Sequence, residues 1–217
     1  MEQPITIALP KGRLFADALA LFGAIGVKGL EGFPDSRRLI AEEAGGQYRF
    51  LALRDADVPT YVEHGAEDLG VVGKDQLLEH GRDLYEPLDL RFGACRLVVA
   101  QPADLRGDGR PEEWSSLRVA TKYPNVTERH FTRRGIQVEI IKLYGSIELA
   151  PLVGLAERIV DLVASGRTLR ENGLVEVEEI ARSSARLIVN RAALKTRYHR
   201  IRVLIGLLRT EIEQGGR

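Results

Sequence analysis

The sequence predicts an α/β protein built from two lobes with a cleft between them. Short apolar runs rich in β-branched residues alternate with segments of helical apolar spacing along most of the 217 residues, a pattern typical of α/β folds with mostly parallel sheets. About a dozen such segments fit two small sheets better than one large sheet. The pattern breaks near 91–94 and 180–184, so we expect a first lobe of residues 1–92 plus 184–217 and a second lobe of residues 93–183.

The expected strands are apolar runs that end at polar or glycine residues, and the expected helices have apolar positions three or four residues apart. The strands are expected at 5–9, 48–53, 69–72, 94–100, 117–121, 138–143, 159–163, 174–180 and 185–190. The helices are expected at 14–25, 57–64, 74–80, 125–134, a short stretch from 146, and 192–212. Asp57 and Asn125 are the expected N-caps of two of them. Residues 104–113 are rich in Asp, Gly, Arg and Pro and predict an exposed loop.

The long C-terminal helix is expected to be amphipathic. Its apolar stripe includes Leu194, Ile201, Leu204, Ile205 and Leu208. Such a stripe packs onto the helix's own lobe or supports an oligomer contact, and both interpretations stay open.

Composition argues against several classes of protein. Lys and Arg together number 31, as do Asp and Glu, and zero net charge is unusual for a general nucleic-acid or anionic-membrane binder. The N-terminus has no basic stretch followed by an apolar one, and no apolar run approaches the roughly 20 residues that cross a bilayer. Cys95, the one cysteine, is expected to be a small buried side chain in a reducing compartment. We therefore expect a cytoplasmic protein.

The strongest local signal is an expected strand that runs into a loop of small residues and then a short helix. The residues that follow the strand are Ala164, Ser165, Gly166, Arg167, Thr168 and Leu169. Backbone N–H groups and the two hydroxyls would form a cradle for an anion, and Gly166 would let the backbone approach a phosphate closely. Asp161, near the strand end, would accept hydrogen bonds from sugar hydroxyls. The loop lacks the ending of a Walker A loop, and such a turn is also an ordinary connection in α/β proteins.

Cations follow other expected strands. Lys11, Gly12 and Arg13 come after the first strand, Arg54 comes after the strand at 48–53, and Arg37-Arg38 form another basic point. Ligands of open α/β sheets bind beyond the carboxyl ends of strands, and an arginine can bind a phosphate with two hydrogen bonds or lie flat on a base. Each position alone also fits a solvated turn or a surface ion pair. Together they predict an anionic substrate.

Several segments match one enzyme family in order and over nearly the whole chain. The longest match comprises Glu148-Leu149-Ala150-Pro151, Gly154-Leu155-Ala156, residues 159–169 and Asn172-Gly173-Leu174. Further matches are residues 8–14, 54–59 and 68–74. The chain resembles ATP phosphoribosyltransferase, which performs the first step of histidine biosynthesis.

The resemblance implies two α/β lobes of the periplasmic-binding-protein kind and a specific reaction. The adenine N1 of ATP attacks the anomeric carbon of 5-phosphoribosyl-1-pyrophosphate (PRPP), and pyrophosphate leaves. Because N1 carries a lone pair, no strong base is needed, and catalysis is expected from positioning and electrostatics. Mg²⁺ is expected to be bound to PRPP oxygens with few protein ligands, and the sequence does not identify those ligands.

The resemblance also implies site residues. The residues expected to bind PRPP are Glu148, Asp161, Ala164, Ser165, Gly166, Arg167, Thr168 and Leu169, with Arg167 acting through its backbone. The residues expected to bind ATP and pyrophosphate are Lys11, Gly12, Arg13, Arg38 and Arg54, of which Lys11 and Arg54 are assigned to catalysis. Glu148 and Asp161 are expected to face ribose hydroxyls or waters on Mg²⁺.

The chain resembles the short, catalytic-only form of the family, which works with a separate regulatory subunit similar to histidyl-tRNA synthetase. This implies a homodimer within a hetero-oligomer, with ATP and PRPP as substrates. From the composition, we expect no nucleic-acid or membrane partner. Two other hypotheses stay open. One is a two-lobed solute-binding or effector-sensing module, since a fold does not fix a function; the other is a phosphoribosyltransferase of the common type, although those carry a run of acids where this chain has only Asp161.

Overall fold

The computed structural model describes residues 3–33, 37–105 and 117–215. Contacts divide the chain into two compact units, the first made of residues 1–77, 81–93 and 184–217 and the second of residues 78–80 and 94–183. Apart from residues 78–80, which group with the second unit, the chain passes between the units at 93–94 and at 183–184. The expected lobe boundaries at 92/93 and 183/184 stay a prediction, and the contact-based units differ from them at residue 93 and at 78–80.

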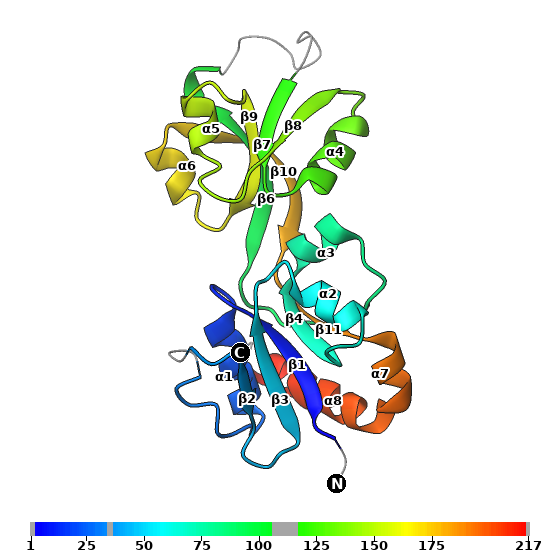
Figure 1. Ribbon diagram of the computed structural model, residues 1–217. Helices are drawn as coiled ribbons and strands as arrows, with labels where there is room; N and C mark the ends of the chain where they lie inside the picture. The colour runs from blue at the N-terminus through cyan, green and yellow to red at the C-terminus, as the bar shows by residue number, and fades with distance from the viewer. Residues whose placement is uncertain (1–2, 34–36, 106–116, 216–217) are drawn as a thin grey trace. The chain divides into compact units, whose positions relative to one another are not determined.

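The first unit contains a six-stranded sheet in the order β2-β3-β1-β4-β11-β5 (Figure 1). Its strands are β1 (Ile5–Pro10), β2 (Ile40–Glu42), β3 (Tyr48–Leu53), β4 (Leu69–Gly73), β5 (Tyr85–Asp89) and β11 (Ala185–Val189). Its helices are α1 (Phe15–Ala24), α2 (Val58–Glu63), α7 (Arg191–Thr196) and α8 (Tyr198–Gly215), and α3 (Lys74–His80) begins in it. Strand β1 runs parallel to both β3 and β4, whereas β2, β11 and β5 run antiparallel to their neighbours.

The second unit contains a five-stranded sheet in the order β10-β6-β9-β7-β8. Its strands are β6 (Cys95–Pro102), β7 (Leu117–Thr121), β8 (Val138–Lys142), β9 (Arg158–Val163) and β10 (Leu174–Ser183). Its helical segments are the 3₁₀ turn η1 (Ala103–Leu105), α4 (Pro124–Thr132), α5 (Leu149–Leu152) and α6 (Arg167–Glu171). Strand β7 is parallel to β8 and β9, whereas β6 is antiparallel to β9 and β10. Most of the loop expected at 104–113 lies outside the described residues.

The expected two-sheet α/β class is confirmed, but the prediction of mostly parallel sheets is wrong. Local strand–helix–strand alternation predicts parallel neighbours, and it does so for β1, β3 and β4. Strand β11 instead enters the first sheet after the chain has passed through the second unit, and it pairs antiparallel with β4 and β5. The direction of β11 depends on how the chain comes back from the second unit, and local periodicity carries no information about that connection.

Two short strands, β2 and β5, were not expected from the sequence. Both lie at the edges of the first sheet, and most of their residues are only partly buried or exposed. Strand β5 contains Pro87, which is tolerated in an edge strand because one side of the strand has no hydrogen-bonding partner in the sheet. An edge strand of this kind lacks the apolar run that identifies a buried one.

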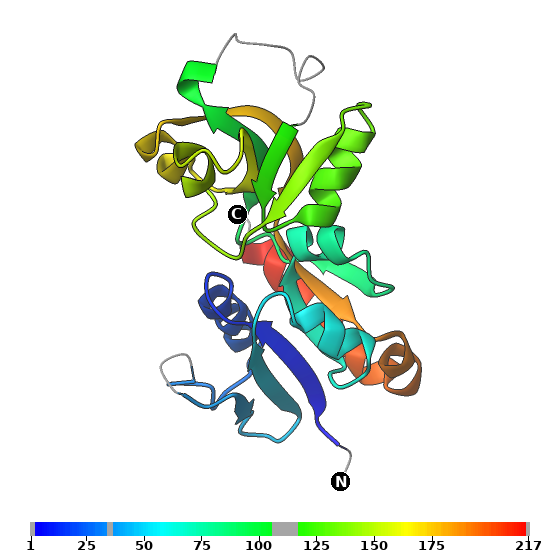
Figure 2. The same ribbon diagram turned by 45° about the horizontal axis from the view of Figure 1, so that its top comes forward.

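Alternation along the central strands covers both faces of each sheet. Ile5, Ile7 and Leu9 pack on the α1 and α8 side of the first sheet, whereas Ala8 packs with α2 on the other. In the second sheet, Val98 and Ala100 pack with α5 and α6, and Leu97 and Val99 pack with α4. Figures 1 and 2 show α4 on one face of this sheet and α5 and α6 on the other.

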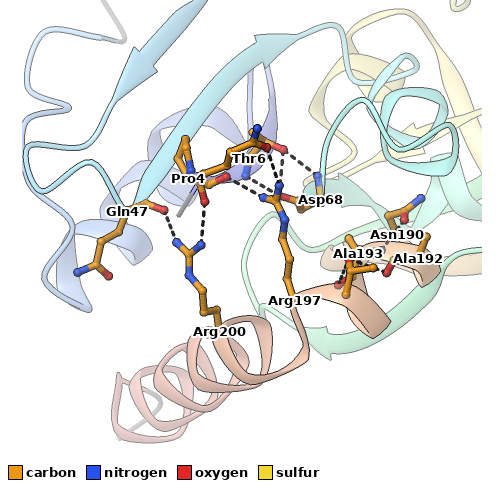
Figure 3. Close-up of polar contacts among 11 residues, drawn as sticks. Pro4, Thr6, Gln47, Asp68, Asn190, Ala192, Ala193, Arg197 and Arg200 are labelled. Atoms are coloured by element: carbon orange, nitrogen blue, oxygen red, sulfur yellow. Dashed lines mark hydrogen bonds and ion pairs between the residues drawn. The ribbon is translucent and has the colours of Figure 1, made fainter. Parts of the chain in front are cut away.

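The expected C-terminal helix is two helices that turn at Arg197. There the guanidinium of Arg197 donates to the carbonyl of Pro4 at 2.8 Å and to the carboxylate of Asp68 at 2.7 Å, while Arg200 donates to the carbonyls of Gln3 and Gln47 (Figure 3). Asn190, the N-cap of α7, accepts from the N–H of Ala193 at 2.8 Å. The predicted apolar stripe packs against the core of the first unit, so one role of α8 is packing onto its own unit.

One of the two expected N-caps is wrong. Asp57 is the N-cap residue of α2, as expected, although its side chain makes no capping bond, whereas α4 begins at Pro124, one residue before Asn125. The carboxylate of Glu79, which is buried in the second unit, instead accepts from the N–H groups of Asn125 and Val126, each at 3.0 Å. A residue distant in sequence thus supplies the cap that local spacing assigned to Asn125.

Glu67 is a buried carboxyl group two residues before β4. Its side chain is only 3% exposed, and its Oε2 has no hydrogen-bond partner among the described residues. Burial raises the pKa of Glu67 from 4.5 to about 7, and the neighbouring charge of Asp68 adds to the shift. The folded protein therefore holds this proton at a pH where the unfolded chain has released it.

We expect this proton to make stability depend on pH. Because the folded pKa is raised, the free energy of unfolding should fall as the pH rises from about 4.5 to about 7, by about 3 kcal/mol, and the contribution should then stay constant. Glu67→Gln removes the titration, so the variant should be more stable than the unmodified chain at pH 8 and similar to it near pH 4.5. Urea unfolding at both pH values measures this, with the exposed Glu128→Gln as control. A constant difference between Glu67→Gln and the unmodified chain across this range would contradict the assignment.

No helix in the described part of the chain combines the length and apolar character needed to cross a membrane.

Candidate functional site

The residues assigned to PRPP lie together in the second unit. A pocket of about 360 Å³ is lined by Glu148, Asp161 and residues 162–169. Every residue that the sequence assigned to PRPP is among them. The pocket thus joins the strand β9, the loop after it and the residue before α5, which is 13 positions upstream of Asp161 in the chain.

The loop of residues 164–169 offers backbone donors and two hydroxyls. Gly166, the N-cap residue of α6, has φ +71°, and this left-handed backbone region is open to glycine at little cost. Gly166 has no side chain that could cap α6, and the first N–H groups of a helix have no intrahelical acceptor. Ser165 Oγ accepts from the N–H of Arg167 at 3.4 Å. The side chain of Arg167 turns to Glu171 instead, with 2.7 Å between Nε and Oε1.

Two carboxylates stand beside this loop. Asp161 is partly buried in β9, and its Oδ1 accepts from the N–H of Leu162 at 2.8 Å. Burial raises the pKa of Asp161, and the charge of Glu148 acts in the same direction, while Lys122 and the Leu162 N–H oppose the rise. Asp161 therefore suits a ligand that donates hydrogen bonds or carries positive charge.

Lys122 is a cation near this pocket that sequence reasoning missed. Thr121 of β7 pairs with Val160 of β9, so Lys122 follows β7 next to Asp161. The Thr121 hydroxyl donates to the carbonyl of Val160 at 2.7 Å and accepts from the N–H of Tyr123 at 2.9 Å, which holds the end of β7 against β9. The signal was available, because Lys122 follows a strand as Lys11 and Arg54 do.

The first unit gathers the predicted cations at one edge of its sheet. Pro10 of β1 pairs in parallel with Leu53 of β3, so the exposed Lys11 and Arg54 follow neighbouring strand ends. The N–H of Lys11 donates to the carbonyl of Leu53 at 2.7 Å, which extends this pairing.

Arg38 and Arg13 approach the same part of the first unit. The N–H of Ala52 donates to the carbonyl of Leu39 at 2.8 Å, which places the preceding Arg38 near the end of β3. Arg13 Nη1 donates to the carbonyl of Gly93 at 2.7 Å. A Cβ at Gly93 would lie only 2.1 Å from Leu14 Cδ2, so this close approach requires glycine. The contact gives Arg13 a structural role at the crossing between the units.

Comparisons with known proteins identify the family. A family model described as HisG: ATP phosphoribosyltransferase matches residues 54–210. The chain belongs to the ATP phosphoribosyltransferase family. An ATP phosphoribosyltransferase from Syntrophotalea carbinolica is 62% identical over 217 residues, covering 100% of this chain and 99% of that protein. One from Geobacter metallireducens is 60% identical over 205 residues, covering 94% and 97%.

Solved structures agree with the family assignment. An ATP phosphoribosyl transferase (HisG:HisZ) complex from Thermotoga maritima contains a chain with a TM-score of 0.83 and 34% identity, covering 97% of this chain and 99% of that one. The periplasmic aliphatic sulphonate binding protein SsuA from Escherichia coli has a TM-score of 0.61 at 12% identity, covering 98% of this chain and 73% of that one. The second likeness concerns the fold alone and confirms its expected periplasmic-binding-protein type.

We expect Gly166→Ala to weaken PRPP binding strongly while the protein stays folded. The substitution forces a Cβ into positive φ, 3.0 Å from both Arg170 Nη1 and Glu176 Oε1, which should cost about 1–2 kcal/mol of stability and raise the KM for PRPP about tenfold. Steady-state kinetics and thermal unfolding measure both effects. Gly206→Ala, in α8 with no atom near the added Cβ, is the control. It should leave the KM for PRPP and the KM for ATP unchanged. An unchanged KM for PRPP in Gly166→Ala would contradict the role of the loop.

Proposed function

We propose that this chain transfers the 5-phosphoribosyl group of PRPP to N1 of the adenine of ATP and releases pyrophosphate, as the first step of histidine biosynthesis. The observation that carries the proposal is the pocket in which Glu148, Asp161 and the 164–169 loop meet, in a chain that belongs to the family. A solute-binding module would share the fold, but the family assignment favours the enzyme.

The 164–169 loop binds the 5-phosphate of PRPP in this proposal. Backbone N–H groups and the hydroxyls of Ser165 and Thr168 supply donors to the phosphate oxygens. Asp161 and Glu148 accept hydrogen bonds from the ribose hydroxyls or from waters on Mg²⁺. Burial raises the pKa of Asp161, so its charged form is destabilised in the chain alone. A ribose hydroxyl or a hydrated Mg²⁺ beside it would stabilise that charged form.

The cations of the first unit bind the charged groups of ATP and pyrophosphate. The N1 lone pair forms the new bond to the anomeric carbon, and the bond from that carbon to pyrophosphate breaks with its electron pair leaving on pyrophosphate. Lys11 and Arg54 offset that growing negative charge, with Gly12, Arg13 and Arg38 beside them. No proton has to leave N1, so the step needs no general base.

Mg²⁺ enters with the substrate. Within the described residues, no cluster of three or more His, Cys, Asp or Glu side chains is placed to hold a metal. The pair Glu148 and Asp161 fits a cation held mainly by PRPP oxygens and water, as is common for Mg²⁺.

The similar Thermotoga maritima protein is found in a HisG:HisZ complex. By analogy, we propose that this chain forms homodimers that assemble with a regulatory subunit similar to histidyl-tRNA synthetase, in the cytoplasm.

The first test follows ultraviolet absorbance after ATP, PRPP, Mg²⁺ and pyrophosphatase are mixed with purified protein. Alkylation at N1 changes the adenine chromophore, so we expect an absorbance change that requires both substrates. Activity that appears only after the regulatory subunit is added would keep the function and make the partner essential. Absence of turnover in both cases, with retained binding of small anions, would instead favour the solute-binding module.

Arg54→Ala tests the catalytic assignment. The residue follows β3 beside Lys11, and we expect kcat/KM to fall at least tenfold, which corresponds to about 1.4 kcal/mol of transition-state stabilisation. Arg49→Ala, which removes another arginine of the same unit that pairs with Glu42, is the control. A fall of less than about threefold in Arg54→Ala, under ~1 kcal/mol, would show that the assigned role is wrong.

A further inference from the structure

Charged side chains outside the residues assigned to substrate support the 164–169 loop. Arg170, in α6, donates from Nη1 to the backbone carbonyl of Ser165 at 3.1 Å. A Cβ built on Gly166 would lie 3.0 Å from Arg170 Nη1 and 3.0 Å from Glu176 Oε1. A guanidinium and a carboxylate thus both lie against the same side of Gly166.

Arg96 holds Glu176 in this place. Its Nη1 and Nη2 donate to the two carboxylate oxygens of Glu176 at 2.7 and 3.1 Å, the two-point geometry that restricts both side chains. Arg96 lies in β6 directly opposite Val163, the last residue of β9 before the loop. The ion pair is therefore anchored to the strand that leads into the pocket. The same contacts with Glu176 raise the pKa of Arg96.

The contact between Arg170 and Ser165 fixes the direction of a backbone donor. In a trans peptide the carbonyl and the following N–H point in opposite directions within one plane. A Ser165 carbonyl held toward Arg170 therefore directs the N–H of Gly166 away from Arg170. The same contact keeps the carbonyl oxygen, which would repel a phosphate, bound to a cation.

We propose that Arg170 is a positioning residue for the 5-phosphate of PRPP: it holds the Ser165 carbonyl and so orients the Gly166 N–H. Glu176, held by Arg96, lies against the same side of Gly166 and supports the loop there. This inference rests on the proposed function, because it concerns how that substrate is held. It adds three residues to the site, each from a different element: β6, α6 and β10.

The test compares Arg170→Ala, Arg170→Lys and Glu176→Gln with the unmodified chain. Calorimetric titration measures the Kd for PRPP, and kinetics measure kcat and both KM values. For Arg170→Ala we expect the Kd and KM for PRPP to rise about tenfold while the KM for ATP stays within about twofold. Arg170→Lys keeps a cationic donor and should recover much of that loss. Arg209→Ala, which removes an exposed arginine of α8 in the first unit, is the charge-matched control and should bind PRPP normally.

Glu176→Gln distinguishes support of the loop by the Arg96–Glu176 ion pair from a general effect of negative charge on phosphate binding. Removing a negative charge near a phosphate site should tighten PRPP binding if only the electrostatic potential mattered. If the ion pair supports the loop, the same variant should bind PRPP about threefold more weakly. Tighter binding by Glu176→Gln would overturn the proposal, as would an unchanged Kd in Arg170→Ala. If the unmodified chain bound no PRPP either alone or with the regulatory subunit, the proposed function itself would fail, and the titration of that chain reveals this separately.

Discussion

A loop binds an anion through its backbone more tightly when its donors are held in place before the ligand arrives, and here β9 imposes that constraint. Strand β9 lies in the middle of the second sheet, between β6 and β7. Ile159 and Val160 are fully buried on opposite faces of it. The last residues of β9 therefore have little freedom, and the 164–169 loop begins from a fixed point. A preorganised donor set of this kind loses less entropy when it binds a substrate than a flexible one does.

The first unit uses its sheet in a comparable way. Parallel pairing of β1 with β3 brings Lys11 and Arg54 to adjacent strand ends, although 43 positions separate them in the chain. These exposed cations remain hydrated at little cost, and they acquire their effect when a polyanion displaces that water. The strand pairing thus places the charges. The helices α1 and α8 stabilise this arrangement because they bury one face of the sheet.

Arginine side chains recur in this protein as clamps on backbone carbonyls. Arg197 and Arg200 bind carbonyls at the start of β1 and before β3, Arg13 binds the carbonyl of Gly93, and Arg170 binds that of Ser165. In each case a planar, permanently charged group holds a peptide in one orientation. Part of the cations in this chain therefore serve the fold, and only some are available to a substrate.

The sequence by itself determined the α/β class with two lobes and the central strands, because buried strands have strong local patterns. It also identified most of the residues that line the pocket, through the small-residue loop after β9 together with the family resemblance. Tertiary structure alone decided the antiparallel entry of β11, the edge strands β2 and β5, the turn at Arg197 and the capping of α4 by Glu79. It also decided that Lys122 lies beside Asp161 and that Arg170, Glu176 and Arg96 stand against the loop. These features join residues far apart in the chain, and local periodicity carries no information about which distant partners a strand edge or a charged side chain will meet.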